Sequence, residues 1–205
     1  MTSASVLERT LKAEIAKAAR REEILAAARR VFAKHGFRGT TIADIADEAG
    51  IALGTIYLYF ASKQDVFAAL NEEFNGLIVA AMTAVPAAVS LDETIRQRVD
   101  NVFRTCAANR DLVRLVVLNT DPDSAATQRM RAADAERSGP MVAGVQAAIS
   151  AGFIRDGDAC IMTKLVTGLV SIAVYQAFIL ADGRDADKYR TGCGDMIVSY
   201  LTPQR

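Results

Sequence analysis

The chain has 205 residues, of which 51% are hydrophobic and 23% are charged, so it can bury a substantial core and is not intrinsically disordered. Its 24 basic and 24 acidic residues cancel, which excludes a polybasic nucleic-acid binder but not a local basic patch. Three separated cysteines and a single histidine, His35, exclude a disulfide scaffold, a cysteine zinc site and a histidine-based triad, and favour a reducing, cytoplasmic location. We expect no metal and no cofactor.

Neither a secretory signal nor a membrane span is expected. Charged residues occur throughout the first 23 positions, so an uncharged signal core is missing there. The longest uncharged apolar run, residues 165–181, is at the lower limit for crossing a membrane and includes several polar residues. We predict that this run is a buried helix.

The N-terminal part of the chain predicts three helices. Apolar residues recur at three- and four-residue steps without strand-like alternation, which predicts an all-α fold. The first helix is expected from Arg20 to Lys34, and Gly36 is its expected left-handed C-cap. A short second helix follows Thr41, and a third is expected over residues 53–60. Two short helices joined by a tight turn behind a longer helix are typical of a helix-turn-helix.

The rest of the chain predicts a larger helical domain. We place the domain boundary after Asp65, which gives residues 1–65 and 66–205. Six helices are expected in order along the second part: residues 63–85, 91–108, 110–119, 123–151 with a break at Gly139–Pro140, 158–181 and 185–201.

One segment carries a specific resemblance. Residues 36–65 read GFRGTTIADIADEAGIALGTIYLYFASKQD. The Gly-Phe pair after the first helix, the Thr-Thr-Ile opening of the second, and the run Gly-Thr-Ile-Tyr-x-Tyr-Phe followed by a lysine resemble the DNA-binding module of the TetR family of bacterial transcriptional regulators. The resemblance implies a homodimer that binds a double-stranded DNA operator. It also implies a helical core that binds a small organic effector and dimerises through its last two helices, with the effector releasing a repressor from DNA.

The expected DNA-reading surface is the first turn of the third helix. Gly54 allows close approach of the backbone, Thr55 offers a hydroxyl, and Leu53 suits a thymine methyl group. Tyr57 and Tyr59 are two residues apart on a helix, so at least one is expected to be exposed. The candidate DNA-binding residues are Thr40, Thr41, Leu53, Gly54, Thr55, Tyr57, Tyr59 and Lys63.

Two features of this surface depart from the family pattern. Ala52 stands where a capping serine is common, which removes about 1 kcal/mol of helix stabilisation, and Leu53 stands where a polar residue is common. The segment from Ile51 to Phe60 holds no charged side chain, so an arginine cannot read guanine from it. Positive charge is expected instead from an N-terminal arm, residues 1–19, and from the amides that follow Thr41. The alternative is that the arm is an ordinary solvated extension.

The long helix at residues 158–181 shows two stripes. One stripe, with residues of the last helix, is the expected dimer interface: Leu165, Leu169, Ile172, Gln176, Ile179, Met196, Ile197 and Tyr200. The other contributes to an expected effector pocket for a neutral or weakly polar molecule, formed by Phe74, Ile78, Phe103, Met141, Thr167, Ser171 and Tyr175. The alternative is that both stripes belong to the core of one chain.

These observations favour a ligand-responsive DNA-binding regulator, most simply a repressor on a palindromic operator. An all-helical enzyme built in the C-terminal cavity and a helical adaptor whose helix-turn-helix binds protein are the alternatives. The only histidine lies in the DNA-binding half, so no base and nucleophile pair is apparent for an enzyme.

Overall fold

A computed structural model describes residues 3–84, 90–119 and 139–203. Within these ranges all regular structure is helical and no strand occurs. The chain divides into two compact units, residues 1–71 and 72–205. The division falls inside helix α4 (Lys63–Thr83), a few residues beyond the boundary expected after Asp65.

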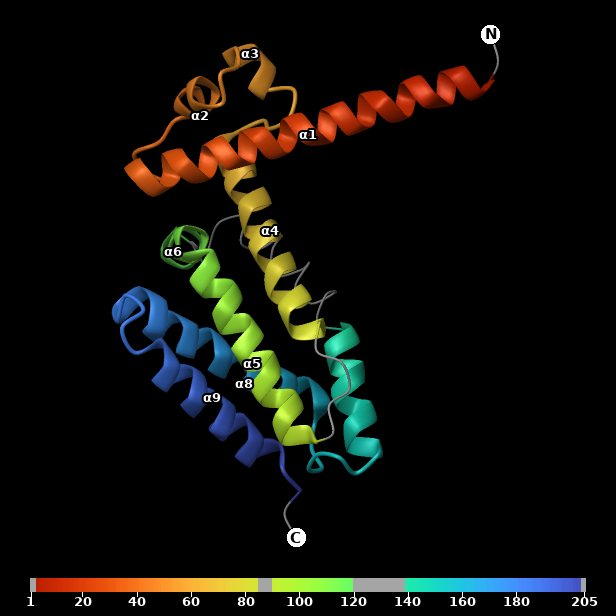
Figure 1. Cartoon of the computed structure of the whole chain (residues 1–205), viewed down its shortest axis with the longest axis vertical. Helices are drawn as coiled ribbons and strands as arrows, with labels where there is room; N and C mark the ends of the chain where they lie inside the picture. Colours follow the sequence, from red (N-terminus) through yellow and green to blue (C-terminus); the bar gives the residue numbers. More distant parts are fainter. Residues whose placement is uncertain (1–2, 85–89, 120–138, 204–205) are drawn as a thin grey trace. The chain divides into compact units, whose positions relative to one another are not determined.

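The first unit contains α1 (Ser3–His35), α2 (Ile42–Glu48), α3 (Leu53–Ile56) and the start of α4 (Figure 1). Apolar residues that face the other helices at three- and four-residue steps form its core. The buried members are Ile24, Leu25, Ala27, Ala28, Val31, Phe32, Ile45, Ala46, Ile56, Phe60, Val66, Phe67, Ala69 and Leu70. This agrees with the apolar stripes expected from the sequence.

Helix α1 is longer than predicted, because it begins at Ser3 and not near Arg20. Figure 1 shows its N-terminal half extending past α2 and α3. No glycine or proline interrupts residues 3–35, and the ion pairs Lys12–Glu8 and Arg20–Glu23 add helical side-chain contacts. The expected arm is therefore a solvent-exposed helical extension.

Glycine shapes the two turns of this unit. Gly36 has a φ of 71° and donates its N–H to the carbonyl of Phe32 at 2.9 Å, which ends α1 as predicted. Phe37 then packs its ring between Phe32 and Phe67, with centroids 5.5 and 5.0 Å away. Gly50, with a φ of 66°, makes the turn between α2 and α3.

Helix α3 is shorter than the expected span of residues 53–60. It ends at Ile56, and residues 57–59 continue as a turn. The N–H groups of Leu58 and Tyr59 donate to carbonyls three residues earlier, at 3.1 and 3.0 Å, which is the tighter spacing of a 3₁₀ turn. Ala52 supplies no side-chain cap, and glycine, threonine and isoleucine are weak helix formers.

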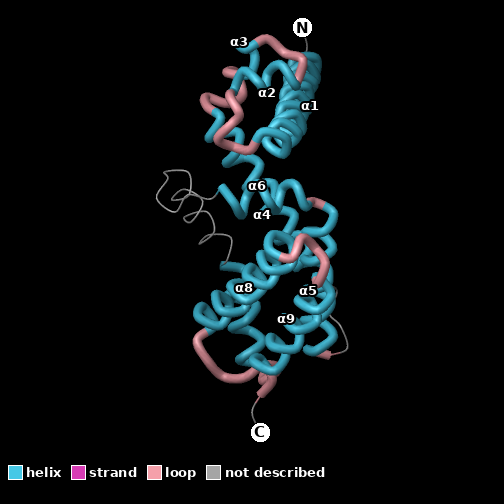
Figure 2. Tube along the Cα trace, turned by 90° about the vertical axis from the view of Figure 1, so that its left-hand side faces the viewer, coloured by secondary structure: helices cyan, strands magenta, loops and turns pink. Residues whose placement is uncertain are grey.

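The second unit is a bundle around α5 (Leu91–Ala108), α8 (Ala159–Tyr175) and α9 (Ala186–Leu201). Helix α9 packs against both α5 and α8 (Figures 1 and 2). Helix α6 (Arg110–Asn119) has its predicted bounds, and residues 139–150 are helical. Residues 120–138, which include the start of the helix predicted at 123–151, lie outside the described residues.

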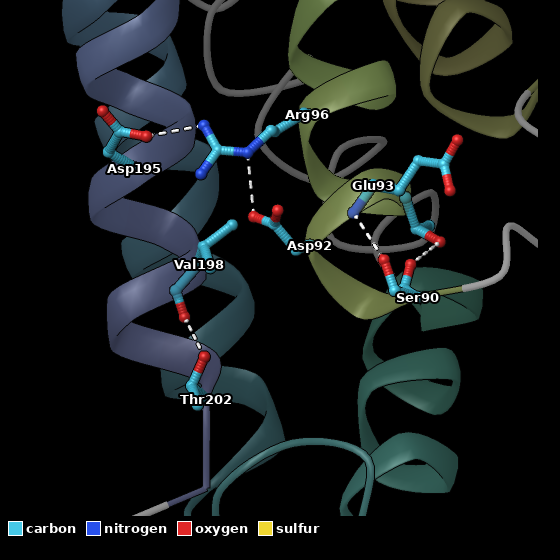
Figure 3. A network of polar contacts seen from close by, with 8 residues as sticks. Ser90, Asp92, Glu93, Arg96, Asp195, Val198 and Thr202 are labelled. Carbon is cyan, nitrogen blue, oxygen red and sulfur yellow. Dashed lines mark hydrogen bonds and ion pairs between the residues drawn. The ribbon is translucent and has the colours of Figure 1, made fainter.

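Side-chain caps start two of these helices. The Ser90 hydroxyl accepts the N–H of Glu93 at 3.2 Å, and Asp158 accepts the N–H of Ile161 at 2.9 Å. Arg96 of α5 bonds Asp92 on its own helix at 2.8 Å and Asp195 of α9 at 2.6 Å (Figure 3). Such exposed pairs stabilise a fold by about 1 kcal/mol or less, so packing of the buried apolar side chains holds α5 and α9 together.

The prediction that residues 165–181 form a buried helix is wrong for a single chain. Ala159–Leu180, which joins α8 to the π-helix η1 (Gln176–Leu180), is the one described helix long and apolar enough to cross a membrane by length and composition, and only 33% of its most apolar stretch is buried. Leu165 and Ile172 expose 54% and 50% of their surface. An apolar helix this exposed is typical of a surface that contacts a partner.

Candidate nucleic-acid interface

The surface of α3 and its following turn is uncharged and partly apolar. Leu53, Tyr57 and Leu58 expose 45%, 51% and 77% of their area, whereas Ile56 and Phe60 are buried beneath them. The buried pair anchors the turn to the core, as the four-residue spacing predicts. The exposed side chains therefore project from a firmly held backbone. Leu58 was not among the residues expected at this surface, although it lies two residues from both Ile56 and Phe60 and would face away from this buried pair on a regular helix as well.

Three hydroxyl groups on this surface are available for an external partner. Tyr57 is exposed, and Thr55 and Tyr59 are half-buried. Over the described ranges, none of the three hydroxyls has a hydrogen-bond partner within the chain. Hydroxyl groups of this kind bond phosphate oxygens or base edges in protein–DNA interfaces.

Gly54 leaves open space where a side chain would be. A Cβ built at this position meets no atom within 4 Å, and the backbone has no positive φ. Neither packing nor backbone conformation therefore requires glycine here, in contrast to Gly36 and Gly50. A glycine with open space on an exposed surface lets an external partner approach the backbone closely.

Thr40 and Lys63 hold the unit together. The Thr40 side chain is 1% exposed and its hydroxyl donates to the carbonyl of Gly36 at 2.8 Å, so the expectation that this side chain reaches DNA is wrong. The Lys63 ammonium donates to the carbonyls of Phe37 and Thr40 at 2.9 and 2.6 Å and lies 4.7 Å from the Phe37 ring centroid. One of its three N–H groups remains for a phosphate.

A complete capping box closes the start of α2. The Thr41 hydroxyl accepts the N–H of Asp44 at 3.2 Å, and the Asp44 carboxylate accepts the N–H of Thr41 at 2.7 Å. The bond from the Thr41 backbone, followed by that from its hydroxyl, lowers the pKa of Asp44. Of the amides after Thr41 that were expected to bind an anion, that of Asp44 is thus used by the Thr41 hydroxyl. Thr41 itself is exposed at this corner.

Three exposed cations of the first unit have no ion pair within the described parts of the chain: Lys17, Lys34 and Arg38. Arg38 lies in the turn that leads into α2 and was missed because a lone cation in a turn has no periodicity. Arg30, by contrast, is bound to Glu48 at 2.6 Å.

The second unit has an apolar cavity of about 100 Å³. Of the residues expected to bind an effector, only Met141 lines it. Phe103 packs on Phe178 with ring centroids 5.8 Å apart, and the hydroxyls of Thr167 and Ser171 bond carbonyls of their own helix. The remaining candidates that do not line the cavity are Phe74, Ile78 and Tyr175. The stripe of α8 that faces the cavity is Thr163, Val166 and Val170, one residue out of phase with the predicted stripe.

Helix α5 supplies four lining residues that were not expected. They are Ile95, Arg98, Val99 and Val102, whose spacing of three and four places them on one face. This periodicity is visible in the sequence and could have identified the face, although not the cavity that it borders.

The residues expected at a dimer interface, called the ridge below, are exposed or half-buried with one exception. Leu165, Ile172 and Met196 expose 50–60% of their area, and Leu169, Gln176, Ile179 and Tyr200 are half-buried. Gly168 leaves space on the same side of α8. Ile197 is 2% exposed and lines the cavity, so its place in the predicted interface is wrong.

Residues 24–70 match the family model of bacterial regulatory proteins of the tetR family. The HTH-type transcriptional repressor AcnR of Corynebacterium diphtheriae is 35% identical over 103 residues, which are 50% of this chain and 52% of that protein. KstR2, an HTH-type transcriptional repressor of Mycobacterium tuberculosis, is 51% identical over 47 residues, 23% of this chain and 24% of that protein. The chain thus spans about half or less of the length of these curated relatives.

Solved structures extend the likeness to the whole fold. The transcriptional regulator FadR of Bacillus subtilis, in complex with stearoyl-CoA, superposes with a TM-score of 0.75 at 21% identity, covering 88% of this chain and 98% of FadR. A TetR transcription regulator of Haloarcula marismortui superposes with a TM-score of 0.74 at 23% identity. The superposition covers 90% of this chain and 100% of that protein. The chain thus carries a helix-turn-helix of the tetR family at residues 24–70, and its fold is that of solved regulators of this family.

Proposed function

We propose that the protein is a cytoplasmic, ligand-responsive transcriptional repressor that binds a palindromic operator as a homodimer. The observation that carries this proposal is the uncharged α3 surface, with three free hydroxyls and the open Gly54, inside a tetR-family helix-turn-helix. The first unit would bind DNA, and the second would dimerise and bind the effector.

Contacts to DNA would divide into two kinds. Tyr57, Tyr59, Lys63 and Thr41 would contact phosphates, and Leu53, Gly54 and Thr55 would meet base edges. A single α3 is too short to read a long sequence. Two of them, held at a fixed distance in a symmetric dimer, would read the two halves of a palindrome.

The exposed ridge of α8 and α9 supports the dimer. Its apolar residues would be covered by the same surface of a second copy, and the space at Gly168 would allow the helices to approach closely. This also accounts for a helix whose composition resembles a membrane span while it belongs to a DNA-binding regulator.

The cavity of the second unit supports a role for a small organic effector. FadR, which shares the fold, is described in complex with stearoyl-CoA. An effector that prefers one arrangement of the second unit would shift the population of DNA-competent dimers.

The raised pKa values of the two buried thiols favour a regulator over an enzyme. Burial raises the pKa of Cys106 to about 12 and that of Cys193 to about 11, so neither provides a thiolate nucleophile at neutral pH. The residues that line the cavity include no acid and no histidine to act as a base.

Selection of bound duplexes from a random library tests the function directly. We expect enrichment of a palindrome whose half-sites are separated by about one helical turn or a multiple of it. The logarithm of the affinity should fall with the logarithm of salt concentration, with a slope set by the number of phosphates contacted. Failure to enrich any sequence, with binding equal to that of random DNA, would contradict the proposal.

The exposed side chain of Leu53 leads to a separate prediction about how DNA bases are recognised. Replacing thymine by deoxyuridine in the selected operator removes only the C5-methyl group. We expect a loss of about 1 kcal/mol per contacted methyl, roughly fivefold in affinity for each half-site, measured by fluorescence anisotropy. The Leu53→Ser variant should bind both duplexes equally. Equal binding of both duplexes by the unaltered protein would exclude methyl readout while leaving operator recognition intact.

A further inference from the structure

We infer that the cavity of the second unit binds an apolar molecule carrying one anionic group, and that Arg98 binds the anion. This rests on the proposed function only in identifying the cavity as the effector site. It replaces the expectation of a neutral or weakly polar ligand.

The lining of the cavity is apolar except at two positions. Methionines from three different helices, together with valine, isoleucine and leucine residues, form the walls. The two polar residues are Thr163 and Arg98. Thr163 is 4% exposed and its hydroxyl donates its proton to the carbonyl of Ala159 at 2.7 Å, so the hydroxyl offers a ligand only lone pairs. Arg98 is therefore the one cation, and the one unused donor group, among the lining residues.

The pairing of the arginines on α5 distinguishes Arg98 from its neighbours. Arg96 bonds Asp92 and Asp195, and Arg104 pairs with Asp100. Arg98 has no ion pair or hydrogen bond in the described part of the chain. It follows Ile95 by one turn and precedes Val102 by another, so its stem lies on the apolar face while its guanidinium reaches solvent.

This arrangement selects ligands by charge. An anion at the mouth gains a charge-assisted and potentially bidentate bond to a guanidinium that no acid of the lining neutralises. A cation placed there would meet Arg98 and find no carboxylate among the lining residues. The apolar remainder of the ligand is drawn into the walls by burial. A carboxylate on an alkyl or ring system is the simplest molecule with both properties.

The size of the cavity limits what enters without rearrangement. Its volume of about 100 Å³ is less than the ~150 Å³ of an engineered cavity that holds benzene. Methionine side chains are flexible and repack readily. We therefore expect Met82, Met141 and Met162 to move aside for a longer chain, so that binding strengthens with chain length.

The experiment is calorimetric titration of the DNA-free protein with decanoate, decanol and decylamine. We expect decanoate to bind at least about tenfold more tightly than decanol, and decylamine to bind most weakly. The Arg98→Gln variant should lose this preference while binding decanol unchanged. Arg104→Gln, an exposed arginine of the same helix, is the matched control and should retain it. Val170→Phe, which fills part of the cavity, should weaken both decanoate and decanol.

Three outcomes would overturn the inference: decanol or decylamine binding as tightly as decanoate, unchanged decanoate preference in Arg98→Gln, or unchanged decanoate binding in Val170→Phe. Because no DNA is present, each of these outcomes leaves the operator experiments unaffected. Conversely, loss of operator recognition would not alter the titrations.

Discussion

Replacing Leu165 and Ile172 together by glutamate is expected to produce a folded monomer that no longer recognises an operator. Both side chains are about half exposed in the single chain, so the charged replacements are solvated there and the helix remains intact. In a symmetric dimer the same carboxylates would be buried close to their own copies, which costs several kcal/mol. Each monomer would then contact only one half-site. We expect operator affinity to fall at least about 1,000-fold, towards non-specific binding.

Light scattering after size exclusion measures the oligomeric state, and anisotropy measures the affinity. Phe153→Glu is the matched control, because Phe153 is 69% exposed but lies in the turn before α8 and not on the ridge. It should leave both measurements unchanged. A double variant that remains dimeric would place the interface elsewhere.

Replacing Gly54 is expected to have opposite effects on stability and DNA binding. The site is helical and a new Cβ meets no atom within 4 Å, so alanine should stabilise the fold by about 0.5–1 kcal/mol. At a DNA surface the same methyl group would fill the space through which the backbone approaches the bases. Steric overlap of this kind costs about 1–3 kcal/mol, roughly tenfold or more in operator affinity, and Gly54→Val should lose more than Gly54→Ala.

Gly76→Ala provides the control, because Gly76 also lies in a helix with open space at its Cβ but belongs to the second unit. It should raise stability and leave operator affinity unaltered. Thermal unfolding and anisotropy titrations give the two quantities. An operator affinity for Gly54→Ala equal to that of the unaltered protein would show that α3 does not approach DNA at this residue.

The local features of the DNA-binding unit could be predicted from the sequence. The C-cap at Gly36, the tight turn between the two short helices and the start of the second helix after Thr41 were each expected. Gly36, Gly50 and the Thr41–Asp44 capping box provide them. These features depend on residues within a few positions of one another. A cap or a left-handed turn is decided by the conformational preferences of one or two side chains.

The end of α3 and the start of α1 were predicted less well. A periodic pattern shows where a helix buries a stripe, so the buried part of α1 was found and its exposed extension was not. Leu7, Leu11 and Ile15 expose 60–74% of their area, and this part of the helix rests on intrinsic propensity and not on packing. The tighter turn after Ile56 carries the same buried pair, Ile56 and Phe60, as a regular helix would.

The sequence by itself determined that the protein is all-helical, that it has a helix-turn-helix, and which side chains anchor that motif, because these depend on local preferences and on the period of the apolar pattern. The tertiary structure alone decided that Thr40 is buried and that the Lys63 ammonium donates hydrogen bonds to two loop carbonyls. It also decided that Thr163, Val166 and Val170 face the cavity. Helix α8 is apolar around most of its circumference, so its pattern has no preferred face. Only the helices packed around it select which stripe meets the cavity and which remains exposed.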